Sequence, residues 1–589
     1  MTTSAVLALS AMALVALVSA VIGSLGVRLA RSTSDFLVAS RTVGPASNAG
    51  AISGEYLSAA SFLGIAGLIL RDGVDALWYP VGFTAGYLAL LLFVAAPLRR
   101  SGAYTVPDFA EARLRSTALR RVCTGFVVVI GWLYMLPQLQ GAGLTLSTIT
   151  NLPSWAGATA AAVIVVATVM LGGMRSITFV QAFQYWLKLT ALALPAVIGL
   201  IFFLSDDRTF DRPAPPQFPT QTDVQIRTDV VLQVQSPVTL TATGRLDGVQ
   251  LERQELNWAV GRHTVSAGAL LQFPSGAPVP VVAGAPVTDA SWLTPFPEGR
   301  EHGLLGTYSL IIALFLGTMG LPHVLVRFYT NPDGRAARRS AVVVLGLLGV
   351  FYIVVTLLGA LSRLYTPQLL VNGDTDAAVL LLPTAVLGNN LIGALLASLM
   401  AAGAWAAFLS TSSGLVVSIA GVLSTDVLRS GSGVRDFRVA SLIAGAVPLA
   451  LSIGVTRLDF TESVALVFAV AASTFCPLLV LGIWWSGLTD RGAIAGVLAG
   501  GLASAAAVAT SLAGLGGTGW VGVLLYRPAL ATVPLAFAVM VLVSRLTSKR
   551  RPYDTDQVML RLHAPERLGL SRDRLNERPS RSGKSKPSS

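Results

Sequence analysis

The segment that decides the fold is AAFLSTSS at residues 406–413, where four hydroxyl side chains follow one another. It lies inside residues 384–425, a stretch without a charged residue that is long enough to cross a membrane. Hydroxyls in such a place bond to their own helix, bridge neighbouring helices, or line a path for an ion or solute. The run places Ser410 and Thr411 three and four residues after Ala407, on one helix face, which favours an ion site.

The composition is that of a chain embedded in lipid. Hydrophobic residues make up 53% of the sequence and charged residues 12%, against roughly 25% charged residues in soluble domains. Cys123 and Cys476 both lie in apolar runs, which excludes a disulfide framework, and the four scattered histidines show no zinc-ligand spacing. We therefore expect an all-α polytopic membrane protein without a structural metal or cofactor.

Runs with few or no charges predict about thirteen spanning helices, since each needs about 20 residues. The first run, which is too long for a signal-peptide core, reads as a retained helix. The predicted spans are residues 4–27, 46–70, 76–98, 122–148, 155–174, 182–204, 303–326, 340–362, 388–425, 439–456, 463–486, 492–514 and 528–545.

Arginine asymmetry predicts the orientation. Arginines are concentrated in the loops at residues 99–121, 327–339 and 429–438. Basic loops stay in the cytoplasm, so we expect a multi-pass protein of the bacterial plasma (inner) membrane with its N-terminus outside and its C-terminus in the cytoplasm. The net charge of +12 is then a topology signal and implies no nucleic-acid partner.

Two segments interrupt the pattern of spans. Residues 205–302 contain more acids than arginines, with alternating apolar residues and Pro/Gly breaks that predict a small β-rich extracytoplasmic insertion. Residues 547–589 predict a basic, disordered cytoplasmic tail that either contacts anionic lipid or only solubilises the chain. The predicted domains are thus helices 1–6 in 1–204, the insertion, helices 7–13 in 303–546, and the tail.

The second predicted span contains GEYLSAASFLG at residues 54–64. A carboxylate such as Glu55 is costly in hydrocarbon, and glycine beside it weakens the helix. We therefore expect a broken helix whose freed carbonyls, beside Ser and Thr hydroxyls, suit a monovalent cation. The alternative is that Glu55 only pairs with a backbone amide or an arginine.

The seventh span contains a further break candidate, GTMGLPHVLVRF at residues 317–328. Broken helices at corresponding positions of two halves with opposite topology are typical of inverted-repeat transporters, although Pro322 could also mark an ordinary kink. His323 and Arg327 are interpreted as interfacial polar residues rather than a proton relay. We expect Lys188, near the start of the sixth span, to extend to the cytoplasmic surface.

Four motifs together resemble the sodium:solute symporter family, and the first and third are most like its cation/acetate (monocarboxylate) symporters. The resemblance covers roughly residues 30–205 and 303–500. The motifs are residues 54–64, GGM at 172–174 with FVQ at 179–181, residues 317–328, and residues 406–411 followed by Asp426.

The resemblance implies a LeuT-like fold with five-plus-five inverted repeats, the first in 46–204 and the second in 303–486. It also implies a Na⁺ site between the second and ninth spans. The residues of that site are Gly54, Leu57, Ala407, Ser410 and Thr411.

Other polar residues receive roles near this site. Many relatives carry an acid where Gln181 stands, so Gln181 argues against a second sodium although Ser413 is well placed. Glu55, Gln181 and Ser413 are candidates for coupling or gating. Tyr56, Ser58 and Ser61 are candidates for solute binding, with ordinary helix packing as the alternative for each.

The expected function is secondary active uptake of a small monocarboxylate such as acetate, propionate or pyruvate, driven by inward Na⁺ movement and alternating access. A different solute (amino acid, sugar or urea), a proton in place of sodium, and a membrane sensor derived from a transporter stay open as alternatives. A channel would need a ring of pore-lining residues, and an enzyme would need a nucleophile or metal ligands; the sequence has neither pattern.

Overall fold

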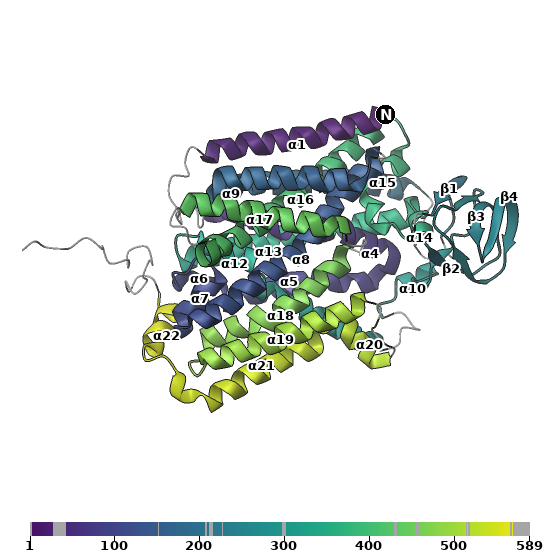
Figure 1. Cartoon of the computed structure of the whole chain (residues 1–589). Helices are drawn as coiled ribbons and strands as arrows, with labels where there is room; N and C mark the ends of the chain where they lie inside the picture. Colours follow the sequence, from purple (N-terminus) through teal and green to yellow (C-terminus); the bar gives the residue numbers. More distant parts are fainter. Residues whose placement is uncertain are drawn as a thin grey trace, which may run out of the picture.

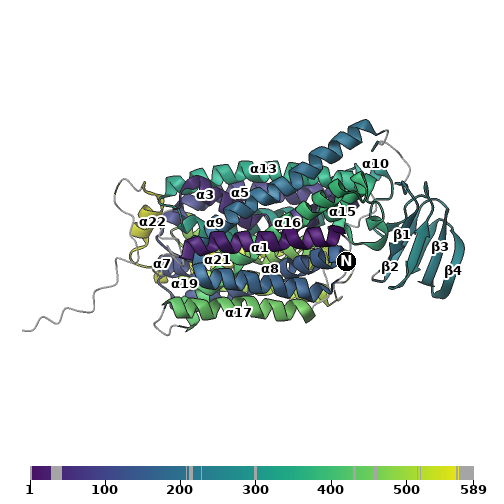
Figure 2. The same cartoon turned by 90° about the horizontal axis from the view of Figure 1, so that it is seen from above.

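The computed structural model describes residues 3–27, 43–150, 152–206, 209–210, 216–226, 228–296, 302–428, 433–454, 460–513, 515, 517, 519–565 and 568. Long helices run roughly parallel in one bundle, and a small sheet lies at one end of it (Figures 1 and 2). Helix α1 begins at this end, which we call the sheet end, and α22 lies at the opposite end.

Most of the described chain is helical. The principal helices are α1 (Thr3–Val27), α3 (Pro45–Tyr56), α4 (Ile65–Asp72), α5 (Trp78–Phe93), α8 (Thr117–Thr150), α9 (Ser154–Ser205), α11 (Gly303–Gly320), α12 (Pro322–Tyr329), α13 (Gly334–Tyr365), α16 (Leu391–Val422), α17 (Gly433–Gly454), α18 (Phe460–Trp484), α19 (Asp490–Leu512) and α21 (Ala529–Leu546). Shorter helices and turns are η2 (Ala60–Gly64), η3 (Gly73–Leu77), α6 (Ala95–Arg100), α7 (Val106–Leu114), α10 (Asp289–Trp292), α14 (Leu369–Asn372), η4 (Thr375–Ala377), α15 (Ala378–Leu387), η5 (Leu423–Leu428), α20 (Gly519–Tyr526), η6 (Ser548–Arg550) and α22 (Thr555–His563).

Among the described residues, eleven helical stretches are long and apolar enough to cross a membrane. This number is lower than the predicted thirteen because two predicted spans fall within one continuous helix, α9. Gly173 interrupts α9 with φ 57° and ψ −160°, a backbone conformation that glycine adopts because it lacks a Cβ. The stretch 60–93 likewise joins α4 to α5 through the turn η3. The count of thirteen therefore stays a prediction.

Both predicted helix breaks are confirmed. Helix α3 ends at Tyr56, Leu57 takes a non-helical conformation, and η2 resumes at Ala60, so the chain opens just after the predicted Gly54–Glu55 position. The second break is at Leu321, which is extended with ψ 113° between α11 and α12. A residue that precedes proline is disfavoured in the helical region, and Pro322 then starts the new helix.

A seven-stranded antiparallel sheet lies between α9 and α11 in the sequence. Its order is β1-β6-β3-β5-β2-β7, with β4 paired to β3. Asp247 and Gly248 form the β3–β4 turn, both with positive φ, as a two-residue hairpin requires. The strands are β1 (Thr222–Gln225), β2 (Val230–Val234), β3 (Val238–Leu246), β4 (Val249–Trp258), β5 (Gly261–Val265), β6 (Leu270–Phe273) and β7 (Val281–Val282).

The sheet is anchored to the bundle rather than tethered by loops alone. Its apolar core continues into Leu70 of α4 and Leu369–Val371 of α14. Trp292, just after the sheet, donates its indole N–H to the Ile69 carbonyl at 2.7 Å, and Arg363 of α13 pairs with Asp289 at 3.0 Å. The position of the sheet is thus fixed against α4 and α13.

The prediction of disorder from residue 547 onward is wrong for the described part of that tail. Helix α22 packs against the bundle end formed by α6 and α7, and Arg115 pairs with Asp554 at 2.5 Å. This hydrogen bond holds the pKa of Asp554 below its usual value. Basic composition alone did not reveal the apolar face of α22, where Leu562 is buried. Residues 569–589 lie outside the described part.

Candidate cation and solute site

The first helix break meets α16 at the predicted hydroxyl run. Ser410 donates its hydroxyl to the Gly54 carbonyl at 2.7 Å and to the Ala407 carbonyl at 3.0 Å. Thr411 donates to the Glu55 carbonyl at 2.7 Å. The hydroxyls of α16 therefore satisfy carbonyl groups that the end of α3 leaves without helical partners.

Glycine at position 54 is required by a close helix approach. A Cβ built on Gly54 would lie 2.3 Å from the Gln181 carbonyl of α9, which is closer than atoms can pack. The backbones of α3 and α9 are thus in direct contact beside the break. This contact brings the buried face of α9 into the site.

Lys188 is the side chain that α9 contributes there. Its Nζ lies 2.5 Å from the Gly54 carbonyl oxygen, 2.8 Å from the Leu57 carbonyl oxygen and 3.1 Å from the Ser410 hydroxyl oxygen. Its side chain has no solvent exposure. The expectation that Lys188 extends to the cytoplasmic surface is therefore wrong, because the rotation of α9 directs it inward and three oxygens receive its three N–H groups.

The predicted sodium ligands are brought together, but around an ammonium group. We call the oxygens of Gly54, Leu57 and Ser410 the oxygen cage. These are the neutral oxygen ligands that a hard monovalent cation prefers, and all three already accept hydrogen bonds from Lys188. Thr411 and the Ala407 carbonyl are committed to bonds within and between helices. In this arrangement the residues do not fit a sodium ion.

Arg327 and Glu55 form a second charged group beside the cage. The Arg327 Nε lies 2.5 Å from the Glu55 carboxylate, and its other nitrogens donate to Thr178 at 2.9 Å and to the Gln181 side-chain oxygen. Arg327 is 0% and His323 2% exposed. The interfacial interpretation of both residues is therefore wrong, whereas the pairing of Glu55 with an arginine, left open from the sequence, is what the structure has.

The other two coupling candidates have structural partners. Gln181 accepts from Arg327 and donates its side-chain N–H to the Ser410 carbonyl at 2.6 Å. Ser413 donates to the Leu409 carbonyl of its own helix at 2.6 Å. Gln181 thus joins the ion pair to α16, while the Ser413 hydroxyl is used within α16.

The three solute candidates are buried close to both breaks. Tyr56 contacts Thr318 of α11 through their hydroxyls at 3.0 Å, and Ser61 contacts the Tyr352 hydroxyl of α13 at 3.2 Å. Ser58 lies in the break itself and is 1% exposed. The Tyr56 hydroxyl therefore links the first broken helix to the second.

Sequence reasoning missed Gln138 of α8. Its side-chain oxygen accepts from the Ala59 amide at 3.0 Å, next to the break, while its side-chain nitrogen has no partner among the described residues. His323, just after the second break, likewise has two ring nitrogens without a described partner, and its ring lies 5.1 Å from that of Tyr134, one turn before Gln138. An uncharged polar residue in the span 122–148 was the available signal for Gln138.

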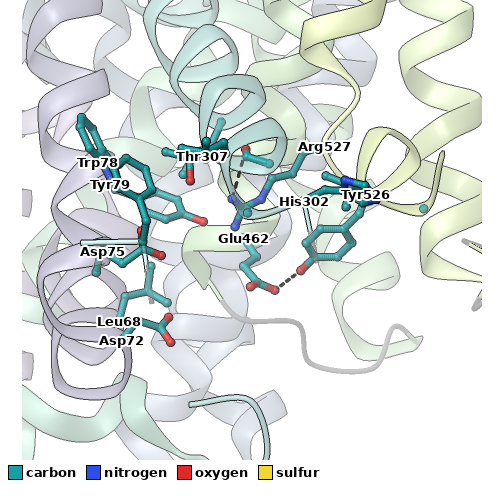
Figure 3. Close-up of a pocket in the computed structure, with 18 of the residues that line it drawn as sticks. Leu68, Asp72, Asp75, Trp78, Tyr79, His302, Thr307, Glu462, Tyr526 and Arg527 are labelled. Carbon is teal, nitrogen blue, oxygen red and sulfur yellow. Dashed lines mark hydrogen bonds between the residues drawn. The ribbon is translucent and has the colours of Figure 1, made fainter. Parts of the chain in front are cut away.

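A cavity of about 640 Å³ opens at the sheet end. It is lined by charged and aromatic side chains from α4, α5, α18 and the α20–α21 turn, including Asp72, Tyr79, Glu462 and Arg527 (Figure 3). Tyr526 points toward Glu462 and donates its hydroxyl to that carboxylate. We call this cavity the vestibule.

An ion network lies at the opposite end of the bundle. Arg120 of α8 pairs with Asp108 at 2.9 Å, with Glu111 at 2.5 Å and with Asp426 at 2.5 Å. Asp426 is the acid that follows the α16 motif, and it also accepts from Thr124. The network ties α7 and α8 to the end of α16.

Two broken helices within a polytopic bundle, joined to each other by the Glu55–Arg327 pair and the Tyr56–Thr318 contact, are typical of secondary transporters. A family model described as the sodium:solute symporter family matches residues 36–243 and 292–500. The chain belongs to the sodium:solute symporter family. It is a transporter and not an enzyme.

Curated relatives support the same class. An uncharacterized symporter of Bacillus subtilis (strain 168) is 29% identical over 522 residues, which cover 86% of this chain and 88% of that protein. A monocarboxylic acid transporter of Corynebacterium glutamicum is 29% identical over 541 residues, which cover 87% of this chain and 86% of that protein.

Solved structures share the fold at low sequence identity. A Na⁺-coupled sialic acid symporter, in a substrate-bound outward-open state, aligns with a TM-score of 0.60 at 13% identity and covers 92% of this chain and 98% of its own. A nucleobase-cation-symport-1 family transporter aligns with a TM-score of 0.50 at 13% identity and covers 89% and 98%. The fold neighbours are of the LeuT type, as expected from the sequence.

Proposed function

We propose that the protein takes up a small monocarboxylate, such as acetate, propionate or pyruvate, by alternating access. The similarity to a monocarboxylic acid transporter over most of both chains supports this substrate class. The observation that carries the proposal is the set of buried side-chain nitrogens of Gln138 and His323 at the two helix breaks, which have no partner among the described residues.

A carboxylate is a group that only accepts hydrogen bonds, so its site needs donors. Gln138 offers a side-chain N–H₂ that no described residue uses, and neutral His323 offers one ring N–H. Unpaired buried donors are costly, and a bound anion would remove that cost. Unwound backbone beside a break also presents amide N–H groups to an anion.

The surroundings suit a short apolar chain behind the carboxylate. Phe83 lies between Tyr352 and Phe468, with ring centroids 6.2 Å and 5.0 Å away, and Tyr56 packs edge-on against it at 6.2 Å. Short aliphatic groups are favourably buried against such aromatic faces. A sugar would instead require several hydroxyl partners.

The vestibule offers the entry path from outside. Tyr79, which lines the vestibule, is one turn before Phe83 on α5, so the two lie on the same helix face. We propose that the sheet end, with α1 beginning there, faces outward and that α22 faces the cytoplasm of a bacterial plasma membrane. The sheet is then an extracytoplasmic domain, and residues 1–204 and 303–546 carry the two groups of spans.

Accumulation of an anion needs an ion gradient. With the cell interior negative, each carboxylate that enters is opposed by about 2.3 kcal/mol per 100 mV of potential. Inward movement of at least one cation cancels this charge. Sodium is the cation that the family name indicates, and a proton is the alternative.

Uptake of labelled acetate, propionate and pyruvate into proteoliposomes tests the proposal. We expect saturable uptake that the three acids inhibit mutually and that sugars, amino acids and urea do not. Gln138→Leu should raise KM about tenfold, since a hydrogen bond to a charged group is worth about 1.5–3 kcal/mol. Gln184→Leu, a buried glutamine of α9 that donates to Ser19 of α1 instead, is the matched control. Uptake of a sugar alone would overturn the substrate class.

A further inference from the structure

We propose that the ammonium group of Lys188 is the resident cation of the oxygen cage, so that no sodium ion binds there and solute uptake proceeds without sodium. The binding part of this inference stands on the cage alone. The uptake part rests on the proposed function.

The hydrogen-bond pattern of the cage matches an ammonium group. The Ser410 hydroxyl has two carbonyl acceptors, Gly54 and Ala407, and when its proton is directed to either of them its lone pairs face Lys188. The two backbone oxygens are acceptors as well. Three oxygens match the three N–H groups of a charged lysine, whereas a neutral amine has two N–H groups and would take the Ser410 proton away from the Gly54 and Ala407 carbonyls.

The direct partners of the ammonium group are neutral oxygens, as those of a bound metal ion can be. Among the described residues no carboxylate oxygen is hydrogen-bonded to Lys188. The Glu55 carboxylate is held by Arg327 and lies against α16, where a Cβ on Gly414 would meet its oxygen at 2.0 Å. Glu55 pairs directly with Arg327 and not with Lys188, so the cage itself holds one positive charge, the charge that sodium would supply.

The position of Lys188 follows from the same contact that requires glycine at position 54. Gln181 touches Gly54, and Lys188 follows it by seven residues, two helical turns along the same face of α9. Its side chain therefore enters the opening between Tyr56 and Ala60. A tethered cation in this place joins three elements, α3, α9 and α16, at one point.

The second cation position that the family resemblance suggests is also used by the protein itself. Gln181 stands in place of the acid and is engaged by Arg327 and the Ser410 carbonyl. The Ser413 hydroxyl bonds within its own helix. Neither residue leaves an oxygen directed at a further ion, and neither carries a negative charge.

Thermal unfolding of the purified protein tests the occupancy of the cage. Sodium chloride is compared with choline chloride at equal ionic strength. The wild-type protein should show the same unfolding midpoint in both salts. Lys188→Ala removes the ammonium and leaves the oxygens, so sodium should stabilise this variant and raise its midpoint, as a ligand that binds only the folded state does.

Three further variants keep this test decisive. Lys188→Met fills the cage with an apolar chain and should show no response to sodium. Adding Ser410→Ala to Lys188→Ala should abolish the sodium response, while adding Ser413→Ala should leave it unchanged. If Lys188→Ala does not fold, the wild-type protein alone provides the test. The inference would be overturned if sodium raised the unfolding midpoint of the wild-type protein and Ser410→Ala removed that rise.

Uptake separates this inference from the proposed function. Labelled acetate is offered to wild-type proteoliposomes at fixed pH gradient and membrane potential, with sodium or choline outside. Equal uptake in both salts is expected, and uptake about tenfold faster in sodium would overturn the inference. Absence of monocarboxylate uptake under every gradient would overturn the proposed function and leave the unfolding result as the test of the cage.

Discussion

Arg327 and Lys188 are both fully buried cations in the middle of the helical bundle, yet their partners differ. Arg327 is held by the carboxylate of Glu55 together with Thr178 and Gln181. Lys188 is held by two carbonyl oxygens and one hydroxyl. One cation belongs to a neutral pair, and the other is surrounded as a metal ion would be.

The difference indicates which cation is structural and which takes part in transport. A buried ion pair loses much of its Coulomb gain to desolvation, and removing one partner leaves a costly lone charge. The cage around Lys188 lies at the helix break, where the backbone already departs from helical geometry and where ions bind in transporters of this architecture. The pair therefore holds α3, α9 and α12 together, whereas the caged ammonium contacts the carbonyls of the helix break, where movement is expected.

Removing Arg327 should have the largest effect on stability. Arg327→Met leaves the Glu55 carboxylate buried without its partner, which costs about 3–5 kcal/mol. We expect a large drop in the unfolding midpoint and in expression. Combining it with Glu55→Gln removes both charges and should recover most of the loss. If the double variant does not recover the unfolding midpoint, the loss in Arg327→Met does not come from the unpaired Glu55 carboxylate.

Removing the charge of Lys188 should abolish transport with a smaller loss of stability. Lys188→Met leaves acceptors without donors, at about 1–3 kcal/mol for a buried group. Acetate uptake in proteoliposomes should fall to background while the protein still folds, as judged by its elution as a single species. Normal uptake by Lys188→Met would show that the caged charge has no transport role.

The two hydroxyls of α16 provide a matched pair of smaller changes. Ser410→Ala removes an acceptor of Lys188 and a donor to Gly54, so we expect a loss of about 1–2 kcal/mol in stability and a clear loss of uptake. Ser413→Ala removes only a bond to its own helix and should change both by little. If the two substitutions reduced stability and uptake equally, the loss in Ser410→Ala could not be attributed to the cage.

The ion pair between Arg115 and Asp554, outside the membrane, should have the smallest effect on stability of those considered. Arg115 lowers the pKa of Asp554 at the surface, so this pair adds stability above the unfolded pKa of about 3.8 and loses it as the pH falls through the lower folded value. Asp554→Asn should cost less than about 1 kcal/mol at neutral pH. The difference from wild type should vanish in acid, and its persistence there would exclude the ion pair as the cause.

The sequence predicted the two helix breaks because glycine and proline change the local backbone preference, and the family resemblance implied the oxygens of the cage. It did not predict where Lys188 and Arg327 point. Both side chains are long enough to reach either an interface or the interior, and the choice depends on how α9 and α12 are rotated against α3. The contact of Gly54 with Gln181 decides this for α9, and it joins residues far apart in the sequence.

Equilibrium binding of radioactive sodium to the purified protein tests the central claim most directly. The account predicts no saturable binding to wild type, and saturable binding to Lys188→Ala that Ser410→Ala removes. Saturable sodium binding to wild type that is lost on Ser410→Ala would contradict it, because the cage would then hold the metal ion rather than the lysine.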